Sequence, residues 1–204
     1  MTKSELIADL EFASAIAKDG AHTPLLGGPI GLMWGCLLIP TLILHGSTLL
    51  GLTPLAIEQI GFVWAAYGVI GTVLSIILGR RISAKAGSAS MLNRLSGALG
   101  TAMGILIFAY AITTVVLVLK NDMPSYLYNF IIVVGFALGC LHGTVLGALS
   151  QRNYLKYCGL ISGVFMVICL LMVKQNEVYF VGAVGIVLTQ IIPNIMEIRG
   201  ERHG

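Results

Sequence analysis

The chain alternates between long apolar runs and short polar connections. Six apolar runs approach or exceed the roughly 20 residues that a membrane-spanning helix needs. They lie at about residues 29–50, 58–79, 95–119, 126–149, 157–173 and 178–196. The pattern therefore predicts an all-α fold, a polytopic membrane bundle of six transmembrane helices over residues 29–196.

The two ends of the chain are more polar. Residues 4–18 have apolar side chains at helical spacing and are acidic overall, which predicts a short N-terminal cytoplasmic amphipathic helix. Helices that lie on a membrane surface are usually rich in Lys and Arg, so we expect this helix to dock on protein. Residues 1–28 are then a cytoplasmic helix and linker, and residues 197–204 a cytoplasmic tail.

Composition strengthens the membrane prediction. Of the 204 residues, 57% are hydrophobic and only 10% are charged, whereas an ordinary soluble domain has about 25% charged residues. So few charges cannot cover the surface of a soluble globule. A soluble enzyme, a nucleic-acid binder and a disordered scaffold are therefore excluded, and the lipid bilayer is the expected partner.

The 12 Lys and Arg residues are distributed unequally. The two tails and the second and fourth connections hold 10 of them, and the other three connections hold 2. Basic residues favour the cytoplasmic side, so this asymmetry predicts six spans with both termini cytoplasmic. Residues 80–94, named here the basic loop, carry the largest group: Arg80, Arg81, Lys85 and Arg94. The loop is one candidate surface for the N-terminal helix, and a separate partner is the alternative.

Glycines recur every four residues in the fourth apolar run, at Gly135, Gly139, Gly143 and Gly147. Small residues at this spacing allow two helix backbones to approach closely. We expect helix packing inside one bundle, with homo-oligomerisation and a substrate groove as alternatives. Related Gly-x-x-Gly-x-Val-Leu motifs begin at Gly68 and Gly182, and a similar one at Cys140, so three duplicated helical hairpins are a further hypothesis.

Ionisable side chains are nearly absent from the apolar runs. All nine Asp and Glu residues fall in tails, connections or run ends, which argues against proton-coupled transport and intramembrane proteolysis. His142 and His45 remain. His142 is expected to be a neutral imidazole bonded to a neighbouring helix, and His45 an interfacial residue. Cys140 and His142 point apart on a helix, so no metal site and no cofactor are expected.

Two prolines interrupt the first and last runs. Each removes a backbone N–H and should kink its helix, and two such kinks are one way to open a cavity between helices. Trp34, Trp64 and Tyr179 lie near run ends, as in a membrane-surface aromatic belt. The candidate polar and cavity residues are Pro40, His142, Gln190, Pro193 and Asn194.

Several short motifs carry a resemblance. They are Gly20…Pro24-Leu-Leu-Gly27-Gly28 with Trp34-Gly35, then Gly79-Arg-Arg81…Gly87…Asn93-Arg94, and the ending at Pro193. In these the chain resembles small uncharacterised six-span bacterial inner-membrane proteins. Its layout of three hairpins is also loosely similar to the HdeD-type acid-resistance membrane proteins. These likenesses imply the six-span fold and no particular activity.

The favoured function is that of a non-enzymatic accessory, assembly or sensory membrane subunit. It would act through helix packing and cytoplasmic contacts, as a homo-oligomer or with a membrane-protein partner. The alternative is a small carrier or channel-like protein for a neutral or lipid-like solute. A third hypothesis is an intramembrane enzyme that uses His142.

Overall fold

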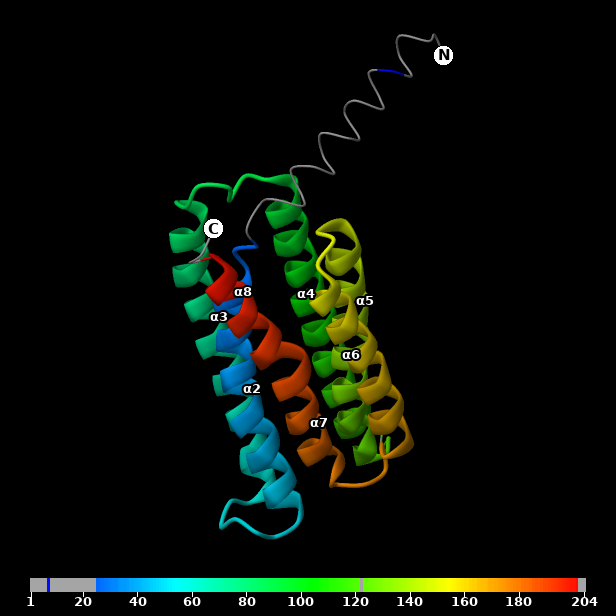
Figure 1. Ribbon diagram of the computed structural model, residues 1–204. Helices are drawn as coiled ribbons and strands as arrows, with labels where there is room; N and C mark the ends of the chain where they lie inside the picture. The colour runs from blue at the N-terminus through cyan, green and yellow to red at the C-terminus, as the bar shows by residue number, and fades with distance from the viewer. Residues whose placement is uncertain (1–6, 8–24, 122, 202–204) are drawn as a thin grey trace.

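The computed structural model describes Ile7, residues 25–121 and residues 123–201. Within these residues all regular elements are helical (Figure 1): α2 (Gly28–Leu49), η1 (Ile57–Gln59), α3 (Ile60–Ser83), α4 (Met91–Lys120), η2 (Ser125–Asn129), α5 (Phe130–Leu149), α6 (Asn153–Leu171), α7 (Val178–Ile186), η3 (Val187–Ile191) and α8 (Ile192–Glu201). Of the helix expected at residues 4–18, the structure describes Ile7 alone, and the rest lies outside the described residues.

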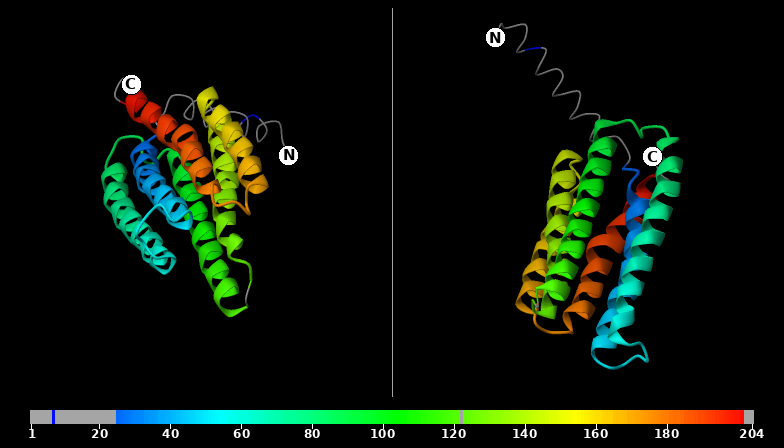
Figure 2. Two further views of the ribbon diagram at one scale, coloured as in Figure 1. Left: turned by 90° about the horizontal axis from the view of Figure 1, so that it is seen from below. Right: turned by 180° about the vertical axis from the view of Figure 1, so that it is seen from behind.

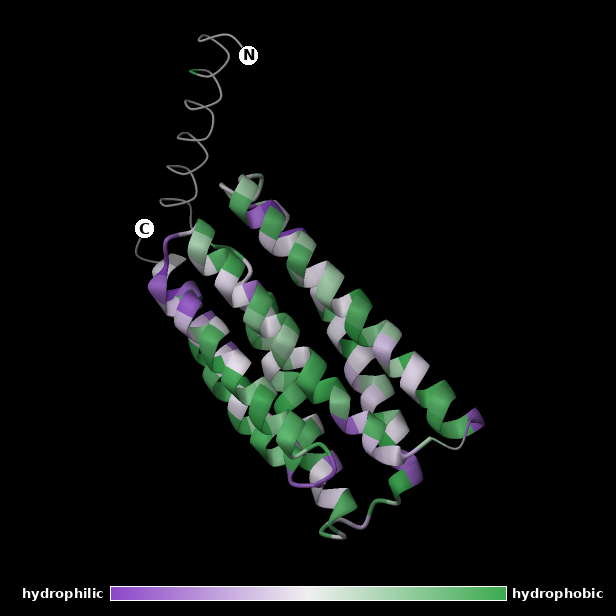
Figure 3. Ribbon diagram, turned by 90° about the vertical axis from the view of Figure 1, so that its right-hand side faces the viewer, coloured by the Kyte–Doolittle hydropathy of each residue, from purple (hydrophilic) through white to green (hydrophobic). Residues whose placement is uncertain are grey.

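Six segments are long and apolar enough to cross a membrane, which confirms the predicted all-α class. They are Gly28–Leu49, Ile57–Ser83, Met91–Lys120, Ser125–Leu149, Asn153–Leu171 and Val178–Gly200. Hydrophilic residues gather at the two ends of the bundle (Figure 3). The chain is therefore a multi-pass membrane protein. Its last span runs a few residues beyond the predicted end at residue 196.

Local sequence accounts for several helix boundaries. Pro29 occupies the first turn of α2, where its missing N–H costs no hydrogen bond. Ser90 caps α4, its Oγ accepting a hydrogen bond from the backbone N–H of Asn93 at 3.3 Å. Just after α2, Gly51 takes a left-handed φ of +69°, a conformation that glycine adopts without strain.

Helix α2 lies at the centre of one half of the bundle. It packs against α3 on one side and against α7, η3 and α8 on another. In the other half α5 packs along α6 over nearly its whole length, and α4 packs on α5 (Figure 2). Helices α3 and α4 follow each other in sequence, yet each packs on a different partner, and they are not a substantial contact pair in the described chain.

We call the end of the bundle with the basic loop and the α5–α6 turn the basic end, and the other the opposite end. A main core near the opposite end joins α2, α5, α6 and α7 through residues such as Leu42, Phe136 and Tyr179. A smaller core at the basic end contains Leu25, Leu92, Leu146 and Leu155. The two cores hold α5 and α6 to the rest of the chain at both ends.

Glycines set the separation of α5 and α6. A Cβ added at Gly143 would lie 2.9 Å from the Cα of Gly159, and one at Gly147 would lie 2.6 Å from the backbone N of Lys156. One added at Gly139 would make an ordinary contact, 3.4 Å from Ser162 Oγ. Gly135 has open space at its Cβ position. Equal spacing along α5 therefore does not give equal packing.

We expect Gly143→Ala to destabilise the protein by about 1–3 kcal/mol, the typical cost of overpacking. The new methyl group meets backbone, which cannot move aside as a side chain can. Unfolding in detergent micelles, followed by circular dichroism, measures the change. Gly135→Ala is the matched control and should unfold like the wild type. Equal stability of all three proteins would contradict the packing described here.

Candidate functional site

A polar row on the last helix faces a row of glycines on α2. Gln190 Nε2 donates a hydrogen bond to the Gly31 carbonyl at 3.0 Å, and Asn194 Nδ2 donates one to the Gln190 carbonyl at 2.6 Å. A Cβ at Gly31 would overlap the Asn194 side chain, and one at Gly35 would press on Ile191. Gln190 thus hydrogen-bonds the last helix to α2, and Asn194 packs against α2 at Gly31.

The last helix changes its winding just before Pro193. Residues Val187–Ile191 form a π-helical turn, and Pro193, which is buried, lacks the N–H that a regular turn would use. The Asn194 amide bonds the Gln190 carbonyl within this region, and Thr189 Oγ1 bonds the Gly185 carbonyl at 2.8 Å. Pro40 is exposed, and α2 continues past it to Leu49.

Five ring side chains form a continuous row, named here the aromatic ladder. Trp34 meets Tyr67 edge to face at 5.2 Å, and Tyr67 meets Trp64 in the same way at 5.6 Å. The Trp64 indole N–H donates to His45 Nδ1 at 3.1 Å, and His45 lies 4.0 Å from Tyr179 between ring centroids. The ladder links α3, α2 and α7.

The ladder shows how the rings near the span ends are packed. His45 is 9% exposed and Tyr179 is 1% exposed, so both side chains are covered by neighbouring helices. Trp34 also faces a neighbouring helix: its ring fills the position of a Cβ at Gly71, and its indole N–H bonds Ser75 Oγ at 2.9 Å. These rings sit near helix ends in the sequence, but their contacts are with other helices.

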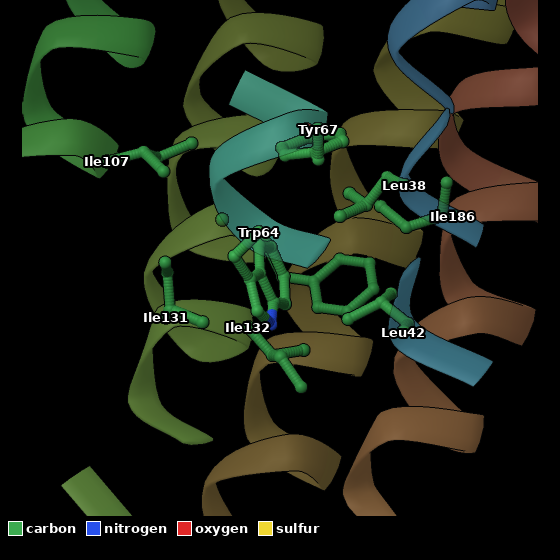
Figure 4. A pocket seen from close by; sticks show the side chains of 10 residues that line it. Leu38, Leu42, Trp64, Tyr67, Ile107, Ile131, Ile132 and Ile186 are labelled. Carbon is green, nitrogen blue, oxygen red and sulfur yellow. The ribbon is translucent and has the colours of Figure 1, made fainter. Parts of the chain in front are cut away.

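Trp64 and Tyr67 also form one wall of an apolar cavity of about 70 Å³ (Figure 4). The remaining lining comes from four other helices: Leu38 and Leu42 of α2, Ile107 of α4, Ile131, Ile132, Gly135 and Phe136 of α5, and Ile186 of α7. The cavity does not include Pro40, His142, Gln190, Pro193 or Asn194. Of the residues singled out from the sequence, Gly135 and Trp64 line it.

His142 lies half-buried on α5, next to Gly143. Its ring has no hydrogen bond to any described residue, so the bond expected to a neighbouring helix is not present in this part of the chain. Among the residues that the structure describes, no group of three or more His, Cys, Asp and Glu side chains is placed to hold a metal ion.

At the basic end, the side chains of Arg80, Arg81, Lys85 and Arg94 are exposed. Asn93 organises this end: its Nδ2 donates to the Gly87 carbonyl at 3.0 Å, and its Oδ1 accepts from the backbone N–H of Leu26 at 2.9 Å. Leu25 and Leu26 are each 2% exposed. The segment before α2 is therefore inserted into the basic end and tied to the start of α4.

Glu197 is a buried carboxyl that the sequence pattern missed, because it follows the last apolar run. It is 9% exposed, it lies against Gly28 of α2, and the charge of Arg152 acts on it. Gln190, Asn194 and Glu197 occur at i, i+4 and i+7, which is one face of a helix. This spacing could have predicted that Glu197 lies on the same face of the last helix as Gln190 and Asn194.

No protein-family model, curated protein or solved structure matches the chain. Of the expectations that the resemblance carried, the six-helix apolar architecture is present, and no match supports a likeness to the HdeD-type proteins or to another named family.

We expect Gln190→Leu to lower the free energy of unfolding in detergent by about 0.6 kcal/mol and by at most about 1.7, the range for hydrogen bonds between transmembrane helices. The substitution removes the bond to Gly31 and keeps the side chain's bulk. Gln175→Leu, at an exposed position between α6 and α7, is the matched control. Gln190→Leu as stable as this control would argue against the contact.

The packing of Trp34 on Gly71 gives a second prediction. In a Trp64→Phe background, Gly71→Ala should push the Trp34 ring away from α3 and break its bond to Ser75, because the new methyl group takes the place of the ring. Tryptophan emission should shift. Gly79→Ala, where an added Cβ meets open space, should leave it unchanged. An unshifted spectrum for Gly71→Ala would show that Trp34 lies elsewhere.

Proposed function

We propose that this chain is a non-enzymatic accessory or assembly subunit of the bacterial inner membrane, with both termini cytoplasmic. In this role it presents α3 to a transmembrane helix of a second copy or of another membrane protein. The observation that carries the proposal is the outer face of α3, which has no helix packed on it among the described residues. In α3 the buried positions are Ile60 and Gly71.

Small residues lie along one exposed flank of α3 at regular spacing. Gly61, Ala65, Gly68 and Thr72 occur at intervals of four, three and four residues, which places them on one side of the helix. A Cβ added at Gly61, Gly68 or Gly79 would meet nothing within 4 Å. Such a stripe is what a transmembrane helix needs for close approach of a second backbone.

The basic loop supplies the second half of the proposal. It begins at the end of α3, where Arg80 and Arg81 are exposed. A partner helix that packs along α3 therefore ends beside a cluster of positive charge. The distribution of Lys and Arg supports a cytoplasmic position for this cluster, where it can bind acidic segments of a partner or serve a sensory role.

The apolar cavity favours a second candidate, a carrier for a lipid-like solute. It lies among five helices, and the π-helical turn before Pro193 gives the last helix a point at which to bend. A carrier moves solute across reconstituted vesicles in the absence of any other protein. An accessory subunit does not, so vesicle transport separates the two candidates.

We expect Gly68→Ile to reduce association through α3 about tenfold, as the loss of roughly 1.4 kcal/mol would do. The branched side chain holds the partner backbone away. Quantitative mass spectrometry after cross-linking in native membranes measures the recovery of the partner, or of the cross-linked dimer, relative to the wild type.

Gly104→Ile is the matched control, because Gly104 lies on α4 and also has open space at its Cβ position. It should leave recovery unchanged. A wild-type chain that cross-links to no protein at all would contradict the proposal. Equal loss in both variants would place the interface on α4 as well.

A further inference from the structure

The apolar cavity lies at the depth of the bilayer's hydrocarbon. Leu42 is seven residues from the end of the first span, and Trp64 is seven residues from the start of the second. At 1.5 Å per residue this is roughly 10 Å inside the end of each helix. Ile107 and Ile186 are also interior to their spans. The cavity is therefore below the level of lipid headgroups.

Its lining is unsuited to water. Eight of the ten lining residues have no polar side-chain atom. The other two are Tyr67, which has a hydroxyl group, and Trp64, whose single N–H is already bonded to His45. A water molecule in a cavity needs two to four polar partners. An ion would need more. The volume of about 70 Å³ is nevertheless several times the roughly 10–15 Å³ that one water molecule requires.

The side chains that line the cavity do not fill it. Gly135 contributes no side chain, and the space at its Cβ position is empty to 4 Å. Trp64 and Tyr67 are held back by the ladder, since each is packed edge to face against a neighbouring ring. An empty space of this kind loses dispersion contacts on every wall, so an occupant stabilises it.

The open side faces the lipid. Helices α3 and α4 carry Tyr67 and Ile107 on either side of the cavity without packing together in the described chain. In the described residues α4 buries Leu92 and Thr114 alone. The route into the cavity thus passes between two helices that are themselves exposed to the bilayer.

We propose that the cavity is a binding site for an acyl chain of a membrane lipid, which enters between α3 and α4. Hydrocarbon is the one material at this depth that matches the lining, and a chain is narrow enough to pass between two helices. The headgroup stays outside, because the lining offers no group to bind it. The site is independent of the partner proposed for α3, and it needs no transport.

The two tryptophans of the chain provide the test. Trp34→Phe leaves Trp64, in the cavity wall, as the single fluorophore. The full-length protein is reconstituted into phosphatidylcholine–phosphatidylglycerol vesicles with or without phosphatidylcholine brominated at mid-chain, since bromine quenches tryptophan at short range. We expect Gly135→Leu to reduce this quenching by roughly half or more, because the leucine replaces the lipid carbons nearest the indole.

Gly104→Leu is the matched control: the same substitution on a transmembrane glycine with open space at its Cβ position, outside the cavity lining. It should leave quenching unchanged. Ile107→Phe fills the cavity from α4 and should act like Gly135→Leu. Emission in unbrominated vesicles must stay the same in all variants, which shows that the Trp64 environment is otherwise intact.

Unchanged quenching in both filling variants would overturn the proposal, since Trp64 would then contact lipid from outside alone. If neither filling variant folds, the wild-type chain still decides. A phosphatidylcholine with a photoactivated diazirine at mid-chain should label the peptide that contains Ile131 and Ile132. Absence of that label, with labelling of exposed α3 residues such as Val69, would equally overturn it.

Discussion

Because lipid chains are as apolar as the helices that they surround, burial does little to hold transmembrane helices together. This protein depends instead on close backbone approach at glycines. Gly143 lies against Gly159, Gly31 against Asn194, and Gly71 beneath the ring of Trp34. In each pair one helix gives up a side chain so that its neighbour can come near enough for dispersion contacts or a hydrogen bond. These glycine contacts determine which helices are neighbours in the bundle.

The same constraint explains where the bundle is open. Glycines of both α5 and α6 bring these two helices together, and Gly28, Gly31 and Gly35 of α2 bring the last helix close. Gly61 and Gly68 of α3, and Gly100 and Gly104 of α4, have no neighbour at the Cβ position. The candidate partner surface lies on α3, and the proposed entry of lipid into the cavity lies between α3 and α4. We therefore expect a partner or a lipid to bind where no other helix of the chain packs on the small residues.

The sequence predicts the number of spans, the helical class and most boundaries, because a run of apolar residues is sufficient to specify a span. It does not predict the pairing of the helices. Apolar side chains face lipid and protein alike, so Gly135 and Gly143 look equivalent in sequence although Gly143 alone meets backbone. Likewise the position of Trp34 near a run end is typical of a membrane-surface residue, and the sequence does not show that its ring packs on Gly71. Glu197 lies past the last apolar run, yet the helix continues and buries it.

The segment before α2 has a mechanical consequence. Leu25 and Leu26 are inserted into the core at the basic end, and the backbone of Leu26 is hydrogen-bonded to Asn93 near the start of α4. Asn93 in turn holds the Gly87 carbonyl of the basic loop. A force on the polypeptide before Leu25 therefore acts on the first turn of α4 as well as on α2. Tension at this one point is shared between the two halves of the bundle.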